Sequence, residues 1–252
     1  ECLKFLHSKG LFVNHSIGAA AAGGSLPCLK FIIEHISFVV MYLNGRHCKE
    51  AAAHGSIACL RYLHGLGCPW GYETAECAAE AGSLECLQFY VENGGDQYDE
   101  FTILHAAALN GHLECLRYAH DHGCEIQKPL AIADLYQARF GVSHGPAYIA
   151  ELTAKRQHWA CVEYLLHHNC PLTRGLTTHL ARGEKHDLLK MAVERGCPLS
   201  AEVCVHYATV GNLEMLTYAH EHGCSWSKRV CERAARGGHL QCLQYAREHG
   251  CP

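Results

Sequence analysis

The 252-residue chain is 49% apolar and carries 21 Lys and Arg against 25 Asp and Glu, a net charge of −4. This apolar content suffices for a large buried core, whereas the mild net acidity disfavours nucleic-acid binding, which requires a basic surface. The longest apolar stretch, residues 38–43, is too short to span a bilayer, so we predict no membrane segment.

One sequence block recurs from one end of the chain to the other. Its clearest copy is Gly-His-Leu-Glu-Cys-Leu-Arg-Tyr-Ala-His-Asp-His-Gly-Cys at 111–124. With the first Cys of the block as anchor, nine copies are found, and the commonest interval between them is about 27 residues, a period typical of repeat proteins. The anchors are Cys2, Cys28, Cys59, Cys86, Cys115, Cys161, Leu188, Met215 and Cys242. Such a period predicts stacked units that bury their apolar faces against one another.

The residues after each anchor predict a short amphipathic helix. An aliphatic residue follows the anchor directly in all nine copies, and an aromatic residue stands three positions after it in eight. These spacings form one apolar stripe on a helix. Seven copies have glycine eight positions after the anchor, where it favours the left-handed conformation that ends a helix. These glycines are Gly10, Gly67, Gly94, Gly123, Gly196, Gly223 and Gly250.

An Ala-rich segment before most anchors predicts a second helix in each repeat. The clearest segments are 48–54, 75–81, 104–110, 204–210 and 231–237, and a turn with glycine separates each from the next anchor helix. Each repeat is therefore predicted to be helix, tight turn, antiparallel helix. We predict an all-α solenoid, one array over residues 1–252 with about nine repeats. Since the chain begins and stops beside second helices, we expect both end repeats to be incomplete and the array to be part of a longer one.

One interval breaks the period. Cys115 and Cys161 are 46 residues apart, 19 more than one repeat of 27. Residues 129–140 have the pattern of an extra helix, and 141–146 that of a loop. We expect an insertion or a decayed repeat at about 125–146. Because insertions in repeat proteins often carry specificity, this segment is a second candidate for partner binding.

Seventeen cysteines raise the question of disulfides. Anchors of successive repeats should lie about 10 Å apart, the packing distance of helices, whereas a disulfide needs Cα atoms within about 7 Å. We therefore predict buried free thiols and a reducing, intracellular or cytoplasmic compartment.

Metal binding and catalysis receive little support from the motifs. A zinc site needs four ligands, and the closest approaches supply two each. These are His112 with Cys115, His120 with Cys124, and His220 with Cys224. The chain also lacks a glycine-rich phosphate loop, a nucleophile elbow and a His-Glu-x-x-His motif. We predict no metal, no cofactor, no small-molecule substrate and no enzymatic activity.

Residues 102–124 resemble the core of an ankyrin repeat. They begin Thr-Ile-Leu-His-Ala-Ala-Ala-Leu-Asn-Gly-His, with Thr-Ile-Leu-His where that core has Thr-Pro-Leu-His, and with its Gly-His turn. An ankyrin repeat has a period of about 33 residues. The repeat of this chain is therefore shorter, and the shortening falls in the connector that carries the β-hairpin finger. Such short, finger-less, Cys-rich repeats are similar to those of large ankyrin families in giant viruses and protists. The resemblance implies an ankyrin-like solenoid with shortened or absent fingers.

The resemblance also implies where a partner would bind. Ankyrin contact positions lie just before the turn and in the connector, and they correspond here to Tyr72, Glu80, Phe101, Leu109, Asn110, Lys155, Arg156, Arg174, Arg182, Lys228 and Arg236. Residues 1–126 hold 7 Lys and Arg against 14 Asp and Glu, whereas residues 127–252 hold 14 against 11. We therefore expect the later repeats to present their Lys and Arg on one side and to attract an acidic segment of a partner.

Two functions remain open. The first is a non-enzymatic scaffold that binds another protein on the concave face of the stack, as the substrate-recruiting arm of a larger adaptor by analogy with ankyrin families. The alternative is a metal- or redox-responsive module that uses its 17 cysteines and 21 histidines. Zinc content and a thiol count separate the two.

Overall fold

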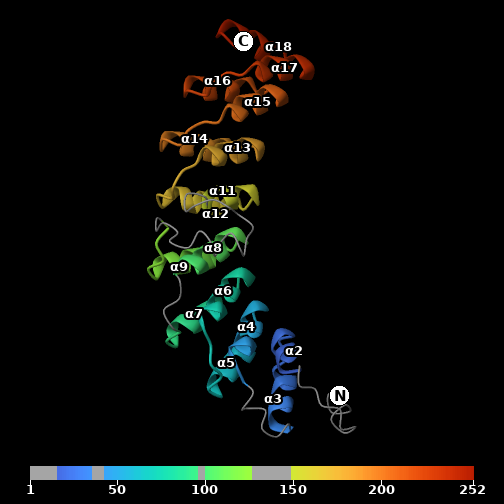
Figure 1. The fold of residues 1–252 in the computed structure, drawn as a ribbon, viewed down its shortest axis with the longest axis vertical. Coiled ribbons are helices and arrows are strands. Elements are labelled where there is room, and N and C mark those ends of the chain that lie inside the picture. The colour runs from blue at the N-terminus through green and yellow to red at the C-terminus, as the bar shows by residue number, and fades with distance from the viewer. Residues whose placement is uncertain (1–15, 36–42, 96–99, 127–148) are drawn as a thin grey trace. The chain divides into compact units, whose positions relative to one another are not determined.

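The computed structural model describes residues 16–35, 43–95 and 100–126, together with 149–252 (Figure 1). These residues form sixteen α-helices and contain no strand. The predicted all-α fold class is confirmed. The first anchor, Cys2, and the interruption predicted at about 125–146 fall almost entirely outside the described residues, so the count of nine repeats stays a prediction.

The chain divides into two compact units, Glu1–Ile126 and Gln127–Pro252. In the N-terminal unit each repeat contributes a first and a second helix. The first helices are α2 (Ser16–Ala22), α4 (Gly45–Ala53), α6 (Tyr72–Ala81) and α8 (Glu100–Leu109); the second helices are α3 (Leu26–His35), α5 (Ile57–Gly65), α7 (Leu84–Glu92) and α9 (Leu113–Asp121). Each first helix packs on its own second helix, and α2, α4, α6 and α8 pack on one another in that order. Figure 1 shows the resulting stack of helix pairs.

The C-terminal unit repeats the same arrangement. Its first helices are α11 (Ile149–Lys155), α13 (Arg174–Arg182), α15 (Ala201–Val210) and α17 (Lys228–Gly237); its second helices are α12 (Trp159–His167), α14 (His186–Glu194), α16 (Leu213–Glu221) and α18 (Leu240–Glu248). Helices α13, α15 and α17 begin one repeat period apart, as the sequence predicts. Several first helices begin a few residues before the Ala-rich core because an Asn, Thr or Ser side chain caps their N-termini, as Thr173 does for α13.

The repeated columns build the core. The anchor Cys115 is 1% exposed and the aliphatic residue after it, Leu116, is fully buried. The first helices α4, α6 and α15 lie between two others of their kind, so small residues such as Ala51 and Ala78 are fully buried on them. Short side chains let these helices approach closely, and the longer apolar residues of the second helices fill the space between the layers.

Glycines end both helices of a repeat, as predicted. Gly67 and Gly223, after second helices, have φ of 76° and 87°, and Gly211, in the turn between helices, has φ of 75°. Three positions hold the same left-handed conformation without glycine. Gln157 and Glu184 occupy the turn with φ of 66° and 55°, and Asn169 occupies a second-helix end with φ of 56°. The fold therefore imposes this conformation at these copies, whatever the residue type.

The cysteine that follows the helix-ending glycine has a role that its sequence pattern did not reveal. Its thiol donates a hydrogen bond to the backbone carbonyl of the residue that caps the first helix of the same repeat. The sulfur-to-oxygen distances are 3.3 Å for Cys68 to Asn44, 3.2 Å for Cys197 to Thr173, 3.3 Å for Cys224 to Ser200 and 3.5 Å for Cys251 to Ser227. Each bond joins the end of a repeat to its beginning, so these cysteines are more than small apolar fillers.

Candidate interaction surface

One row of cations lies at the turn ends of the first helices in the C-terminal unit. Lys155, Arg182 and Arg236 each stand two residues before the left-handed turn residue, on α11, α13 and α17. All three are exposed, and Arg156 beside them is exposed as well. Helix α15 has Thr209 at the equivalent position. We call Lys155, Arg182 and Arg236 the turn-end row.

The remaining two predicted cations of this unit do not belong to that row. Arg174 and Lys228 are exposed, but they are the first residues of α13 and α17. Arg182 is the last residue of α13, which places it about 12 Å from Arg174 along the helix axis at 1.5 Å per residue. The predicted cations therefore lie at the two opposite ends of the first helices, and the expectation that they share one side of the stack stays a prediction.

Two histidines adjoin the turn-end row and were missed from the sequence. His179 on α13 and His206 on α15 occupy the same column in successive repeats, and both are half-buried. Burial lowers the pKa of His179, and the nearby cations Arg182 and Lys155 lower it further against the opposing effect of Glu151. A comparison of first-helix columns at the repeat period would have revealed these histidines.

His206 has a similar electrostatic setting. Burial lowers its pKa first, and Arg182 and His186 act in the same direction, while Glu184 opposes them. Arg182 thus acts on histidines of two successive first helices. This part of the surface holds neutral imidazoles among fixed positive charges. The approach of a negative group is therefore electrostatically favourable there.

The predicted positions of the N-terminal unit have diverse environments. Tyr72 is 49% exposed at the start of α6. Glu80 is half-buried, and its backbone carbonyl accepts a hydrogen bond from His112 of the next repeat at 3.0 Å. Asn110 is exposed, and its side-chain amide donates to the carbonyl of Ala106 at 2.8 Å, which caps the end of α8.

One predicted position of this unit is buried. Leu109 is only 2% exposed. This corrects its assignment as a partner contact, since its side chain fills the space between helices instead of facing solvent. The side chain of Phe101 lies outside the described residues.

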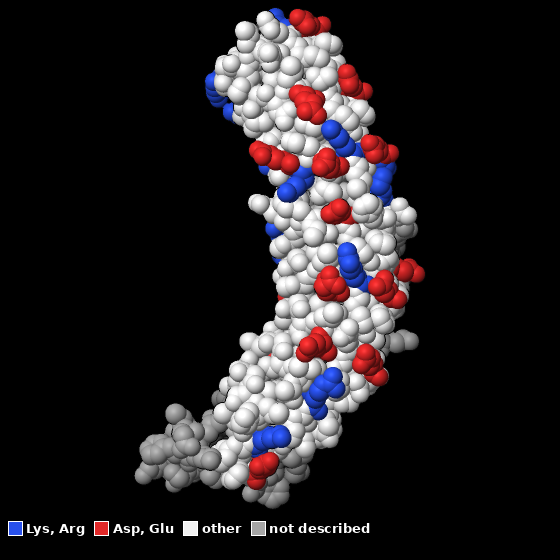
Figure 2. Space-filling model, turned by 180° about the vertical axis from the view of Figure 1, so that it is seen from behind, with Lys and Arg blue, Asp and Glu red and all other residues white. Residues whose placement is uncertain are grey.

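Charges of both signs are mixed elsewhere. Figure 2 shows a face on which Lys and Arg side chains lie beside Asp and Glu in both units. Some ion pairs join neighbouring repeats, such as Lys49 with Glu73 at 3.0 Å and Lys190 with Glu214 at 3.6 Å. The turn-end row differs because its three members follow one column of the repeat.

The cysteines and histidines singled out as possible metal ligands have structural partners. His112 bonds to the Glu80 carbonyl, and His220 stacks on Trp226 with ring centroids 4.4 Å apart. The residues that the structure describes contain no group of three or more His, Cys, Asp or Glu that could hold a metal ion. Burial raises the pKa of Cys115 and of Cys161 to about 11, so these thiols are protonated at neutral pH and are poor nucleophiles.

Over the described ranges, no helix has both the length and the apolar character needed to cross a membrane. A family model described as ankyrin repeats (3 copies) matches residues 49–130 and 75–174. A comparison with curated proteins finds no match.

Proposed function

The chain belongs to the ankyrin-repeat family, whose members bind other proteins, and from this premise we propose that it is a non-enzymatic scaffold whose C-terminal unit binds an acidic segment of a protein partner. The turn-end row Lys155, Arg182 and Arg236 carries the proposal, because three exposed cations follow one repeat column. The neutral histidines beside the row add donors that become cationic when a carboxylate approaches.

The geometry of stacking suggests the spacing of the acidic residues. Packed helices lie about 8–10 Å apart, and an extended peptide advances about 3.3 Å per residue, so every third residue of the peptide meets a new repeat. Lys155 and Arg182 are one repeat apart, and Arg182 and Arg236 are two. A matching partner segment has carboxylates at its positions 1, 4 and 10.

A synthetic peptide tests this proposal. A fluorescent 12-residue peptide with Glu at positions 1, 4 and 10 is titrated with the protein, and its anisotropy gives Kd at low and at physiological salt. Reversing the charges of Lys155, Arg182 and Arg236 to Glu should weaken binding at least tenfold at low salt, and added salt should reduce the difference. A control variant, Arg46→Glu with Arg117→Glu and Arg247→Glu, has the same net charge. Equal losses in both variants would show non-specific attraction and overturn the proposal.

The proposal extends to an adaptor that works in a reducing, intracellular compartment, with this array as its recruiting arm. All sixteen cysteines of the described residues are free. Some thiols interact in pairs, since Cys68 raises the pKa of Cys48 and Cys224 raises that of Cys204. A thiol count on denatured protein from its native cell should give all 17 cysteines reduced; oxidised pairs would favour a redox-responsive module instead.

A further inference from the structure

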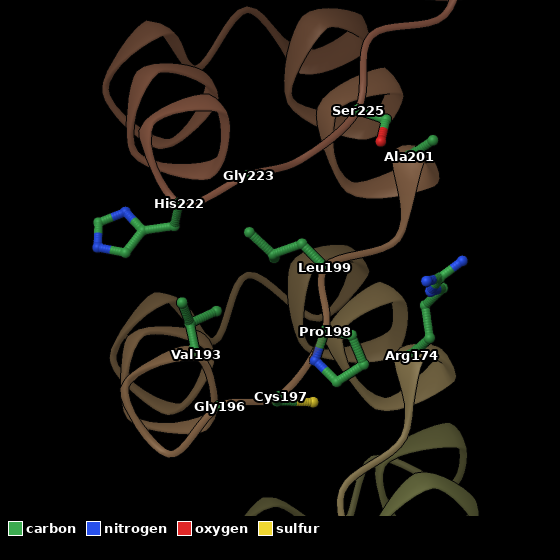
Figure 3. A pocket seen from close by; sticks show the side chains of 10 residues that line it. All are labelled: Arg174, Val193, Gly196, Cys197, Pro198, Leu199, Ala201, His222, Gly223 and Ser225. Atoms are coloured by element: carbon green, nitrogen blue, oxygen red, sulfur yellow. The ribbon is translucent and has the colours of Figure 1, made fainter.

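A cavity opens between two successive repeats of the C-terminal unit, at the connector ends of their helices. Its volume is about 460 Å³. Among the residues that line it are Val193, Leu199, His222 and Arg174. Figure 3 shows the Leu199 side chain directed toward the space between Val193 and His222, while the His222 ring points outward.

The next repeat shows what occupies the equivalent space. Trp226 stands one repeat period after Leu199. Its indole stacks on His220 with ring centroids 4.4 Å apart, and its ring N–H donates a hydrogen bond to the carbonyl of His249 at 3.0 Å. The ring of Tyr245 meets the indole edge-on at 6.3 Å.

An equivalent arrangement recurs in the N-terminal unit. Trp70 stacks on His64 with centroids 3.9 Å apart and meets Phe89 edge-on at 5.6 Å. An indole on a histidine thus closes the connector end of two different repeats of this chain.

The cavity lies where the histidine and tryptophan side chains of these repeats are replaced by smaller side chains. One repeat earlier, His220 corresponds to Val193, Trp226 to Leu199 and His249 to His222, and all three equivalents line the cavity. Two aliphatic side chains stand in place of an imidazole and an indole. The volume that the rings fill elsewhere is left open, and the carbonyl that would accept an indole N–H is the one of His222.

A second observation marks the same place as incomplete. In the next repeat, the hydroxyl of Tyr245 is hydrogen-bonded to His220 Nδ1 at 3.1 Å. Tyr218 is the equivalent of Tyr245, and Val193 cannot form this bond. The buried Tyr218 hydroxyl has no hydrogen-bond partner among the described residues. The repeat therefore lacks both the imidazole and the indole of its relatives.

We propose that this cavity is a binding site for a tryptophan side chain of a protein partner. The indole lies between Val193 and Leu199, and its N–H donates to the carbonyl of His222, as Trp226 does to His249. Arg174 is exposed at the rim and favours an acidic residue next to the tryptophan. The site goes beyond the proposed function, because it lies at the connector ends and the turn-end row lies at the opposite ends of the first helices.

N-acetyl-tryptophanamide serves as the probe, followed by methyl NMR of protein labelled at its Leu and Val methyl groups. Saturable shifts are expected at Val193 and Leu199. Leu199→Trp fills the cavity from within and should abolish the shifts that remain observable, those at Val193. Val210→Trp adds a tryptophan at an exposed position of α15, 47% exposed, and should leave them unchanged. Methylation of the probe's indole nitrogen should weaken binding about two- to tenfold through loss of one hydrogen bond.

Three results would overturn this proposal. They are the absence of saturable shifts up to the solubility limit of the probe, shifts that persist in Leu199→Trp, and equal binding of the N-methyl probe. If Leu199→Trp alone does not fold, the double variant Val193→His with Leu199→Trp restores the histidine–tryptophan pair of the other repeats, and a labelled methyl group of Ala201, which also lines the cavity, reports binding in this variant and in wild type. The acidic peptide binds elsewhere, so the two proposals fail independently.

Discussion

The imidazole of His112 lies against Gly82 of the preceding repeat, where a side chain at Gly82 would otherwise project. Its Nε2–H donates to the carbonyl of Glu80 at 3.0 Å, and a Cβ added at Gly82 would lie 2.3 Å from its Nδ1. His239 has the same relationship to Gly211 and to the carbonyl of Thr209. The Gly-His turn is thus a contact between repeats as well as a turn within one.

Because of this contact, substitution by alanine should destabilise the protein to different extents at two similar glycines. Gly211 and Gly238 have φ of 75° and 73°, but only Gly211 has His239 within 4 Å of its added Cβ. Gly238→Ala should cost about 1–2 kcal/mol from left-handed strain alone. Gly211→Ala should cost clearly more because His239 must move. Urea unfolding measures both, and in the His239→Ala background the two costs should become equal. If they are equal already with His239 in place, the contact has no energetic role.

Two non-glycine turn residues should be improved by glycine. Gln157 and Glu184 have φ of 66° and 55°, so Gln157→Gly and Glu184→Gly should each raise the free energy of unfolding by about 1 kcal/mol, since glycine relieves the strain. Glu163→Gly, within helix α12, is the control and should lower it by a similar amount. A loss of stability at the turn positions would show that contacts of these side chains stabilise the fold by more than the backbone strain costs.

Buried thiols should make stability depend on alkaline pH. Burial raises the pKa of Cys161 from 9.0 to about 11. The folded state therefore holds more protons than the unfolded state between these values, and the thiol's contribution is complete below pH 9 and is lost toward pH 11. Cys161→Ala should flatten the fall in unfolding free energy over this range, by at most about 1.4 kcal/mol per pH unit. Cys28→Ala, at a half-buried position, is the control. An identical slope in wild type and Cys161→Ala would contradict this effect.

Periodicity was sufficient to predict the helix pairs, because a column that must face the core tolerates few residue types. Periodicity did not predict features that depend on backbone conformation or on backbone hydrogen-bond acceptors. Gln157 and Glu184 show that a turn forms without its glycine, and the thiol bond from Cys68 to the Asn44 carbonyl depends on a backbone acceptor that has no sequence signature.

The candidate surface was harder to predict than the fold. Leu109 shares a turn position with Lys155 and Arg182, yet it is buried. Arg174 lies at the opposite end of α13 from Arg182, a separation that the charge pattern alone did not specify. Recognition positions vary freely between repeats, so their environment depends on neighbouring side chains in space, which the column alone does not specify.

The histidines predict how acidic-peptide binding varies with pH. Burial and the cations Arg182 and Lys155 lower the pKa of His179, against Glu151, and burial with Arg182 and His186 lowers that of His206, against Glu184. Both are neutral in the free protein at pH 7.5, and carboxylates of a bound peptide favour their protonation. Affinity should therefore rise as pH falls from 7.5 toward 6. Anisotropy titrations at each pH measure this, and the double variant His179→Gln with His206→Gln should lose the dependence; if it keeps the full dependence, other groups are responsible.

Amine footprinting of the complex tests most directly which surface binds. The rate of lysine acetylation is measured by mass spectrometry with and without the 12-residue peptide that has Glu at positions 1, 4 and 10. Lys155 is exposed on first helix α11, whereas Lys190 lies on second helix α14, paired with Glu214 at 3.6 Å. We predict that the peptide slows acetylation of Lys155 and leaves that of Lys190 unchanged. Protection of Lys190 with Lys155 unaffected would place binding on the second helices and contradict the account.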